Sequence, residues 1–117
     1  MSKIVIIGAG AMGSAFALPC LDNNHDVNIV GTHLENDFID LLNKNNYLHP
    51  GLNTEIPKEI KIHKFEKFDE IMKSNVDLIV LGISSKGIEW VADQLSRVYK
   101  DAKTPKLLML TKGLSIY

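Results

Sequence analysis

The stretch KIVIIGAGAMGSAFA, residues 3–17, joins an uncharged apolar run to three glycines at the spacing Gly8-x-Gly10-x-x-Gly13. Ile4 to Ile7 are apolar at every position and mostly β-branched, as in a strand that is covered on both faces of a parallel sheet. The residues after the glycines are good helix formers. We therefore predict a buried strand, a tight turn and a helix that begins at the turn.

Each glycine of this spacing has its own physical role. Gly8 permits a sharp turn, Gly10 lets the backbone approach a diphosphate, and Gly13 lets the helix lie close to the strand. Ala9, Gly13 and Ala17 recur every four residues, so we expect a stripe of small residues to face the sheet. Backbone N–H groups at the start of a helix bind anions. The stretch thus predicts a dinucleotide-binding turn.

The composition suits one domain and excludes several classes of partner. The chain has 117 residues, 45% hydrophobic and 23% charged, with a formal net charge of −1. Scattered lysines and arginines give no basic face for nucleic acid or for a membrane surface. Three glycines and Pro19 interrupt the uncharged run from Ile4 to Leu21, which argues against a signal peptide or a membrane span.

Cysteine and histidine usage predicts neither a disulfide nor a metal site. Cys20 has no partner cysteine and lies in an apolar helix, so we interpret it as a small buried residue of a cytoplasmic protein. The four histidines have no spacing that is typical of metal ligands.

The rest of the chain continues to alternate strand and helix signals. A helix is expected from Ala11 to Asn23, with a kink or an early end at Pro19. A strand over 27–30 follows, and then a helix that contains Phe38, Leu41 and Leu42. Residues 43–58 are polar and carry two prolines, which predicts a long surface loop.

The second half of the chain predicts three further strands, over 60–63, 78–81 and 107–110. Between them we expect a small helix with Phe65, Phe68 and Met72 facing inward, and a longer amphipathic helix from Ile88 to Val98. Alternating strands and helices of these lengths predict an α/β fold of the Rossmann type. It is a doubly wound, mainly parallel sheet with helices on both faces.

The end of the second strand bears on cofactor choice. In dinucleotide folds an acidic residue here selects NAD, whereas a neutral or basic residue tolerates the 2′-phosphate of NADP. The sequence at this point is Gly31-Thr32-His33, so it favours NADP slightly over NAD. Thr32 has an alternative role, because Thr32-x-x-Glu35 is a capping box. His33 has one too, as a solvated histidine.

Two further strand ends are expected at the same edge of the sheet. Ser84, Ser85 and Lys86 follow the strand over 78–81 and are candidates for cofactor contact, or alternatively a helix cap and a solvated lysine. Lys112 follows the last strand and is a candidate ligand for a phosphate group.

Four segments together resemble NAD(P)-dependent glycerol-3-phosphate dehydrogenases of bacteria and archaea. They are GAGAMGSA at 8–15, YLHPG at 47–51, GISS at 82–85 and TKGL at 111–114. The combination is more specific than the glycine spacing, which many dehydrogenases share. The resemblance covers nearly the whole chain.

The resemblance implies a cofactor-binding domain over residues 1–117 and a separate helical catalytic domain that this chain lacks. It implies reduction of dihydroxyacetone phosphate by NAD(P)H, with no catalytic residue in this part. Ala11 and Met12 would touch the cofactor, Thr32 would lie by the adenosine ribose, and Lys112 would contact both cofactor and substrate. The family commonly has an aromatic residue at the position of Met12 and often a basic one at that of Thr32.

Other interpretations of the glycine turn stay open from the sequence. GAGAMGS is also typical of ketopantoate reductases, although the TKG and HPG segments argue against them. A stand-alone module that senses NAD(P)H is the alternative outside enzymes, and binding of S-adenosylmethionine is a more distant one.

Overall fold

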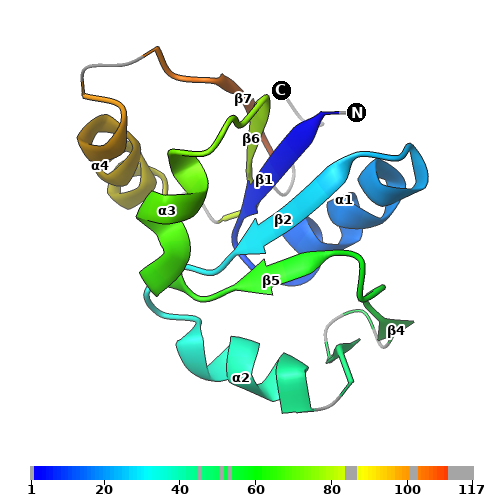
Figure 1. Ribbon diagram of the computed structural model, residues 1–117. Helices are drawn as coiled ribbons and strands as arrows, with labels where there is room; N and C mark the ends of the chain where they lie inside the picture. Colours follow the sequence, from blue (N-terminus) through cyan, green and yellow to red (C-terminus); the bar gives the residue numbers. More distant parts are fainter. Residues whose placement is uncertain are drawn as a thin grey trace, which may run out of the picture.

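A five-stranded parallel sheet forms the centre of the protein (Figure 1). The computed structural model describes residues 2–44, 46–50, 52, 54–83, 87–100 and 103–110. The strands of this sheet are β1 (Lys3–Ile7), β2 (Asp26–Val30), β5 (Lys61–His63), β6 (Leu78–Leu81) and β7 (Lys106–Met109). Their order is β5-β2-β1-β6-β7, with all four pairings parallel. The order reverses between β1 and β6, and a doubly wound sheet binds its ligands beside such a point.

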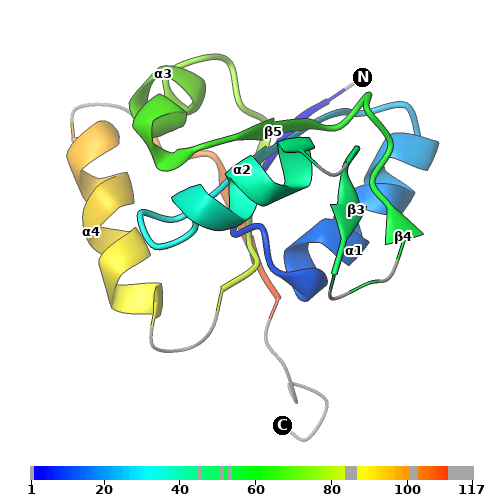
Figure 2. The same cartoon turned by 90° about the horizontal axis from the view of Figure 1, so that it is seen from below.

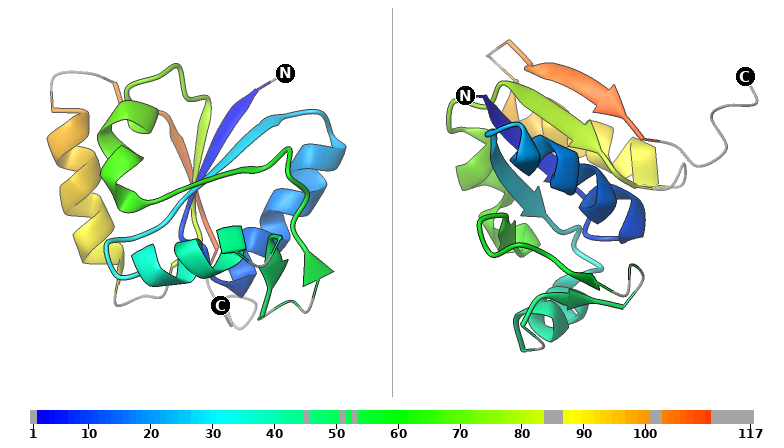
Figure 3. Two further views of the ribbon diagram at one scale, coloured as in Figure 1. Left: turned by 60° about the horizontal axis from the view of Figure 1, so that its bottom comes forward. Right: turned by 90° about the vertical axis from the view of Figure 1, so that its right-hand side faces the viewer.

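The helices are α1 (Ala11–Asp22), α2 (Asn36–Lys44), α3 (Phe68–Met72) and α4 (Ile88–Val98), with a short 3₁₀ helix η1 (Phe65–Lys67) before α3. Helix α1 lies on one side of the sheet and α3 and α4 lie on the other (Figure 3). The structure therefore confirms the doubly wound α/β fold with helices on both faces.

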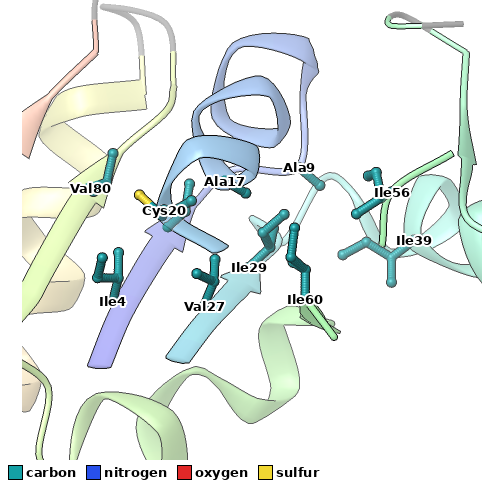
Figure 4. Packing of buried hydrophobic residues seen from close by; sticks show 11 residues of the cluster. Ile4, Ala9, Ala17, Cys20, Val27, Ile29, Ile39, Ile56, Ile60 and Val80 are labelled. Carbon is teal, nitrogen blue, oxygen red and sulfur yellow. The ribbon is translucent and has the colours of Figure 1, made fainter. Parts of the chain in front are cut away.

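Alternation along the central strands divides the core into two layers. Ile4 and Ile6 of β1 face the layer under α1, where Ala17, Cys20 and Ile29 also lie (Figure 4). Val5 and Ile7 face the other layer, which contains the buried side chains of α3 and α4. A strand that is apolar at every position is needed because both of its faces are covered.

The predicted packing of the helices is confirmed. Ala9 and Ala17 are fully buried, so the small-residue stripe of α1 does face the sheet. Phe68 and Met72 of α3 are buried, with Phe65 partly buried beside them. In α4, Val91 and Leu95 are buried while Ile88 and Val98 pack at the margin of the same layer.

Pro19 does not end α1 early, so of the expected kink or early end the second is wrong. The helix continues three residues past the proline to Asp22, and the Asn23 side chain then donates a 2.7 Å hydrogen bond to the Pro19 carbonyl. Ala15, whose carbonyl would have accepted the missing N–H, lies like Pro19 on the exposed face of the helix. Water can satisfy that carbonyl, so the helix tolerates the proline.

The predicted loop over 43–58 is also partly wrong. It contains the end of α2 and a two-stranded antiparallel hairpin, β3 (Leu48–His49) and β4 (Thr54–Glu55). The hairpin lies next to α2 and the start of α1 (Figure 2). Tyr47 packs against the core as expected, but Leu48 is 43% exposed and Ile56 is the buried residue that follows the hairpin.

Cys20, a residue of α1, is buried, and this burial raises the pKa of its thiol. The thiolate is the reactive form of cysteine, so the side chain behaves as a small apolar group, as predicted. Among the described helices, none combines the length and the hydrophobicity that a membrane crossing requires.

Candidate dinucleotide site

The glycine turn packs α1 against the ends of two strands. Gly8 has a φ of +113° and its N–H donates a 2.8 Å hydrogen bond to the Val30 carbonyl. A Cβ on Gly8 would collide with the carbonyl oxygen of Gly82, and one on Gly13 would lie 2.6 Å from the carbonyl oxygen of Gly8. Gly82 in turn packs against the Gly13 backbone. Three glycines are therefore required by contacts within the protein itself.

Gly10 differs from these glycines. It caps the N-terminus of α1 with φ −67° and ψ 178°, a conformation open to any residue. A Cβ built on it meets no atom of the described residues within 4 Å. The fold alone thus gives no reason for a glycine here, whereas a ligand that lies against the backbone would give one.

Several N–H groups at this turn face no protein acceptor. The first four N–H groups of a helix have no partner within it. Within the described part of the chain, the N–H groups of Gly10 and Gly13 donate to no protein atom. The Gly10 N–H therefore belongs to a residue beside open space, at the positive end of the α1 dipole, whereas Gly13 is buried beneath the cleft.

The peptide of Ala9, inside the turn, is held on both sides. Its N–H lies 3.2 Å from each carboxylate oxygen of Glu35. Its carbonyl accepts a 3.1 Å bond from the Ser14 hydroxyl and lies 2.9 Å from Nε2 of the buried His49. These contacts fix the orientation of the turn through residues up to 40 positions away in the chain.

The loop between β2 and α2 has the Thr32–Glu35 bond of the predicted capping box, but this bond closes a turn that precedes α2. The Glu35 carboxylate accepts a 2.8 Å bond from the Thr32 N–H, and the Thr32 hydroxyl accepts a 3.3 Å bond from the Leu34 N–H. Helix α2 then begins at Asn36. Thr32 thus stabilises the turn before α2 and does not cap the helix, and it also lines the cleft described next.

A cleft of about 590 Å³ opens at the carboxyl ends of β1, β2 and β6. Its walls come from the glycine turn, the loop after β2, the end of β6 and the start of α4. The lining residues are Gly10, Thr32, His33, Leu34, Glu35, Gly82, Ile83, Gly87 and Trp90. Apart from Thr32, His33 and Glu35, the lining residues that the structure describes carry no polar side-chain atoms except the indole N–H of Trp90.

An aromatic cluster forms one end of this cleft. The His33 ring lies 4.5 Å from the Trp90 ring and 6.2 Å from that of Phe65, between centroids, and Phe65 lies 5.1 Å from Trp90. His33 is exposed but packs on Trp90, so it is more than the solvated histidine of the alternative interpretation. The contact connects the loop after β2 to α4 across the cleft.

The structure brings together part of the predicted site. Gly10, Thr32 and His33 line the cleft, whereas Gly8 and Gly13 lie in the close packing beneath it. Ala11 and Met12 are the first two residues of α1. The remaining predicted residues, Ser84, Ser85 and Lys112, lie outside the described residues.

Sequence reasoning missed several residues of the cleft. The sequence pattern indicates Glu35 only as part of a capping box. In the structure its carboxylate reaches the end of β2, where the sequence predicts no acidic residue. Leu34, Ile83 and Trp90 give the cleft its apolar walls. The spacing of apolar residues in α4 predicted which face is buried, but no sequence signal placed Trp90 at the cleft.

Comparisons with known proteins support one family. A family model described as the N-terminus of NAD-dependent glycerol-3-phosphate dehydrogenase matches residues 3–116. NADP(+)-dependent glycerol-3-phosphate dehydrogenase of Archaeoglobus fulgidus is 30% identical over 111 residues, which are 95% of this chain and 31% of that protein. Glycerol-3-phosphate dehydrogenase [NAD(P)+] of Oceanobacillus iheyensis is 30% identical over 97% of this chain and 31% of its own length.

Among solved structures, glycerol-3-phosphate dehydrogenase from Coxiella burnetii superposes with a TM-score of 0.72 at 22% identity. The match covers 97% of this chain and 33% of that one, and at this identity it shows the shared fold. The chain thus spans about 31% of the length of the curated relatives named above. The family match favours the glycerol-3-phosphate dehydrogenase resemblance over the ketopantoate reductase alternative. This chain belongs to the family of NAD-dependent glycerol-3-phosphate dehydrogenase N-terminal domains.

Proposed function

We propose that the chain binds NAD or NADP in the cleft between the glycine turn and α4. The observation that carries this proposal is the open space at Gly10. Gly8, Gly13 and Gly82 are explained by contacts within the protein. No contact among the described residues explains the glycine at position 10, whereas a ligand that approaches the backbone would explain it.

The residues of the cleft fit the parts of a dinucleotide. The N–H groups of Gly10 and Gly13 would donate to the diphosphate, helped by the α1 dipole. The loop over Thr32 to Glu35 would lie beside the adenosine ribose. The aliphatic and aromatic walls, Ile83 and Trp90 among them, suit the flat faces of a base. Ser84, Ser85 and Lys112 stay candidates for further contacts.

The proposed role is that of the cofactor-binding part of a glycerol-3-phosphate dehydrogenase. NAD(P)H would supply the hydride that reduces dihydroxyacetone phosphate to sn-glycerol 3-phosphate. Hydride transfer also needs a positioned carbonyl and a proton donor within about 3 Å. We propose that a helical catalytic domain supplies these, that it shares the substrate with Lys112, and that the whole enzyme works in the cytoplasm.

Residues 1–117 by themselves should therefore bind the cofactor without catalysing the reduction of dihydroxyacetone phosphate. The names of the relatives and the share of their length that this chain covers support this division of labour. An assay of the purified chain with dihydroxyacetone phosphate and NADH or NADPH tests it. Reduction at a rate typical of enzymes, about 1 s⁻¹ or more, would contradict it.

Replacing Gly10 by valine tests the binding site itself. The side chain would enter space that the protein leaves open, so the fold should persist while the diphosphate loses its path. We expect NADH and NADPH affinity to fall at least about 100-fold, because the backbone donors can no longer be reached. Calorimetry or Trp90 fluorescence measures the affinity, and circular dichroism checks the fold.

The matched control is Thr104→Val, which places the same side chain at the opposite end of the sheet, near Ser2 and Leu78. The affinity of the Thr104→Val variant for NADH and NADPH should equal that of the wild type. If Gly10→Val keeps full affinity, the ligand binds somewhere other than the glycine turn.

A further inference from the structure

The side chain of Glu35 connects two segments that form the proposed adenosine end of the cleft. It stands just before α2, and its carboxylate turns back toward the tip of β2 to accept the Thr32 N–H at 2.8 Å. The same carboxylate reaches the Ala9 N–H of the glycine turn at 3.2 Å through both oxygens. A negative charge is thereby placed between the end of β2 and the turn.

Among the described residues, no lysine or arginine forms an ion pair with this carboxylate. Glu35 is half-buried and lines the cleft beside Gly10 and Thr32. The ion pairs found among the described residues join other carboxylates, those of Asp26, Asp40 and Asp69, to lysine or arginine. Within the described part of the chain, Oε2 accepts the Ala9 N–H alone. A carboxylate oxygen has two lone pairs, so Glu35 retains capacity to accept from a ligand.

We propose that Glu35 discriminates between the two cofactors by disfavouring the 2′-phosphate of NADP. In a dinucleotide fold the adenosine ribose lies where the second strand ends, beside the glycine turn. A carboxylate there accepts a hydrogen bond from a free 2′-hydroxyl and repels a phosphate on the same oxygen. The inference rests on the proposed function, since it requires that a dinucleotide occupy this cleft.

This role of Glu35 favours NAD, the opposite of the slight preference for NADP that the sequence predicts. That preference considered only Gly31, Thr32 and His33, among which no carboxylate stands. The structure shows that the acidic group comes from four residues beyond Gly31 and reaches the same place through the capping box. A carboxylate that served only as a cap would stabilise α2 and have no effect on cofactor choice.

The test is the ratio of NADPH to NADH dissociation constants for the 117-residue chain and its Glu35→Gln variant. Glutamine keeps one oxygen for the Thr32 N–H but removes the charge. We expect the ratio to fall roughly tenfold in Glu35→Gln, because only the 2′-phosphate distinguishes the ligands. Both cofactors carry the diphosphate, so any effect of the lost charge on diphosphate binding cancels in the ratio.

Two controls separate this effect from folding and from net charge. Glu35→Asp keeps the charge on a shorter side chain and should leave the ratio within about twofold of the wild type. Glu59→Gln makes the same charge change at an exposed turn away from the cleft and should leave the ratio of dissociation constants unchanged. Added salt should also lower the ratio in the wild type more than in Glu35→Gln, since it screens the repulsion.

The outcomes are distinct for the two proposals. If both cofactors bind and Glu35→Gln leaves the ratio unchanged, Glu35 acts only as a cap and this inference is wrong, while the proposed function stands. If neither cofactor binds the wild-type chain, the proposed function fails and the inference fails with it.

Discussion

At the scale of single residues, the glycines of the turn divide into those required by the fold and one left for a ligand. A sequence pattern treats Gly8, Gly10 and Gly13 alike, because it records only the lack of side chains. The structure separates them by what an added Cβ would meet: backbone at Gly8 and Gly13, and open space at Gly10. Substitutions at Gly8 or Gly13 should therefore reduce the stability of the fold, whereas larger side chains at Gly10 should reduce ligand binding.

Gly13→Ala should destabilise the protein, whereas Gly10→Ala should not. The alanine Cβ at position 13 would lie 2.6 Å from the carbonyl oxygen of Gly8, which belongs to the backbone and cannot rotate away. We expect a loss of about 2 kcal/mol in the free energy of unfolding, after any gain in helix propensity. Gly10→Ala, at an N-cap with open space, should cost less than about 1 kcal/mol.

Urea unfolding, followed by circular dichroism, measures both changes. Equal stabilities for the two variants would contradict the distinction between the glycines. Gly10→Ala then serves as the matched control, since it adds the same methyl group three residues away in the same turn.

At the scale of elements, local patterns predicted the strands and helices but not the contacts between distant segments. The apolar runs at Ile4–Ile7 and Leu78–Leu81 identified β1 and β6, because a strand that is buried on both faces is apolar at nearly every position. The hairpin β3–β4 was missed because its strands have only two residues each and lie among prolines and glycines. Such short strands have no periodicity to detect.

The same limit explains which site residues were missed. His49 is buried because its ring bonds the Ala9 carbonyl, 40 residues earlier, and packs on Phe38. Glu35 has a local signal as a cap, but its bond to Ala9 depends on how β2 lies beside β1. Capping and periodicity are local properties, whereas the cleft is made by the packing of several elements. The glycine turn was predictable because its function is encoded in adjacent residues.

The edge strand β5 gives the fold a dependence on pH. His63, its last residue, is partly buried and lies 3.3 Å from Asn28 of β2 through Nε2. Burial, followed by the positive charges of Lys61, Lys3 and Lys67, lowers the pKa of this histidine from 6.5. Folded His63 therefore stays neutral at a pH where the unfolded chain already takes up the proton.

We expect the free energy of unfolding to fall as the pH drops below about 6.5, because the unfolded state then binds more protons than the folded state. His63→Gln removes this group and should make the decrease between about pH 7 and pH 5 shallower. Denaturant unfolding at a series of pH values measures the slope. An identical slope in the wild type and His63→Gln would show that the depressed pKa of this histidine does not contribute.

At the scale of the whole molecule, the fold gathers one end of a parallel sheet into a binding surface. The reversal of strand order beside β1 brings the glycine turn, the loop after β2 and the end of β6 to the same cleft. Among the described strands β7 is the last in the sheet, and its Leu107, Leu108 and Met109 are each at least 39% exposed. Apolar side chains exposed on an edge strand are typical of a surface that further protein covers.

We propose that main-chain N–H groups of the glycine turn hold the diphosphate of a dinucleotide. The most direct measurement is a titration of the ¹⁵N-labelled chain with NADH, followed by the amide resonances of each residue in heteronuclear NMR spectra. We predict that Gly10 and Gly13 show the largest shifts, with smaller ones at Thr32, Glu35 and Trp90, and that all of them saturate together. Saturable shifts confined to the opposite end of the sheet, around Ser2, Leu78 and Thr104, would contradict the account.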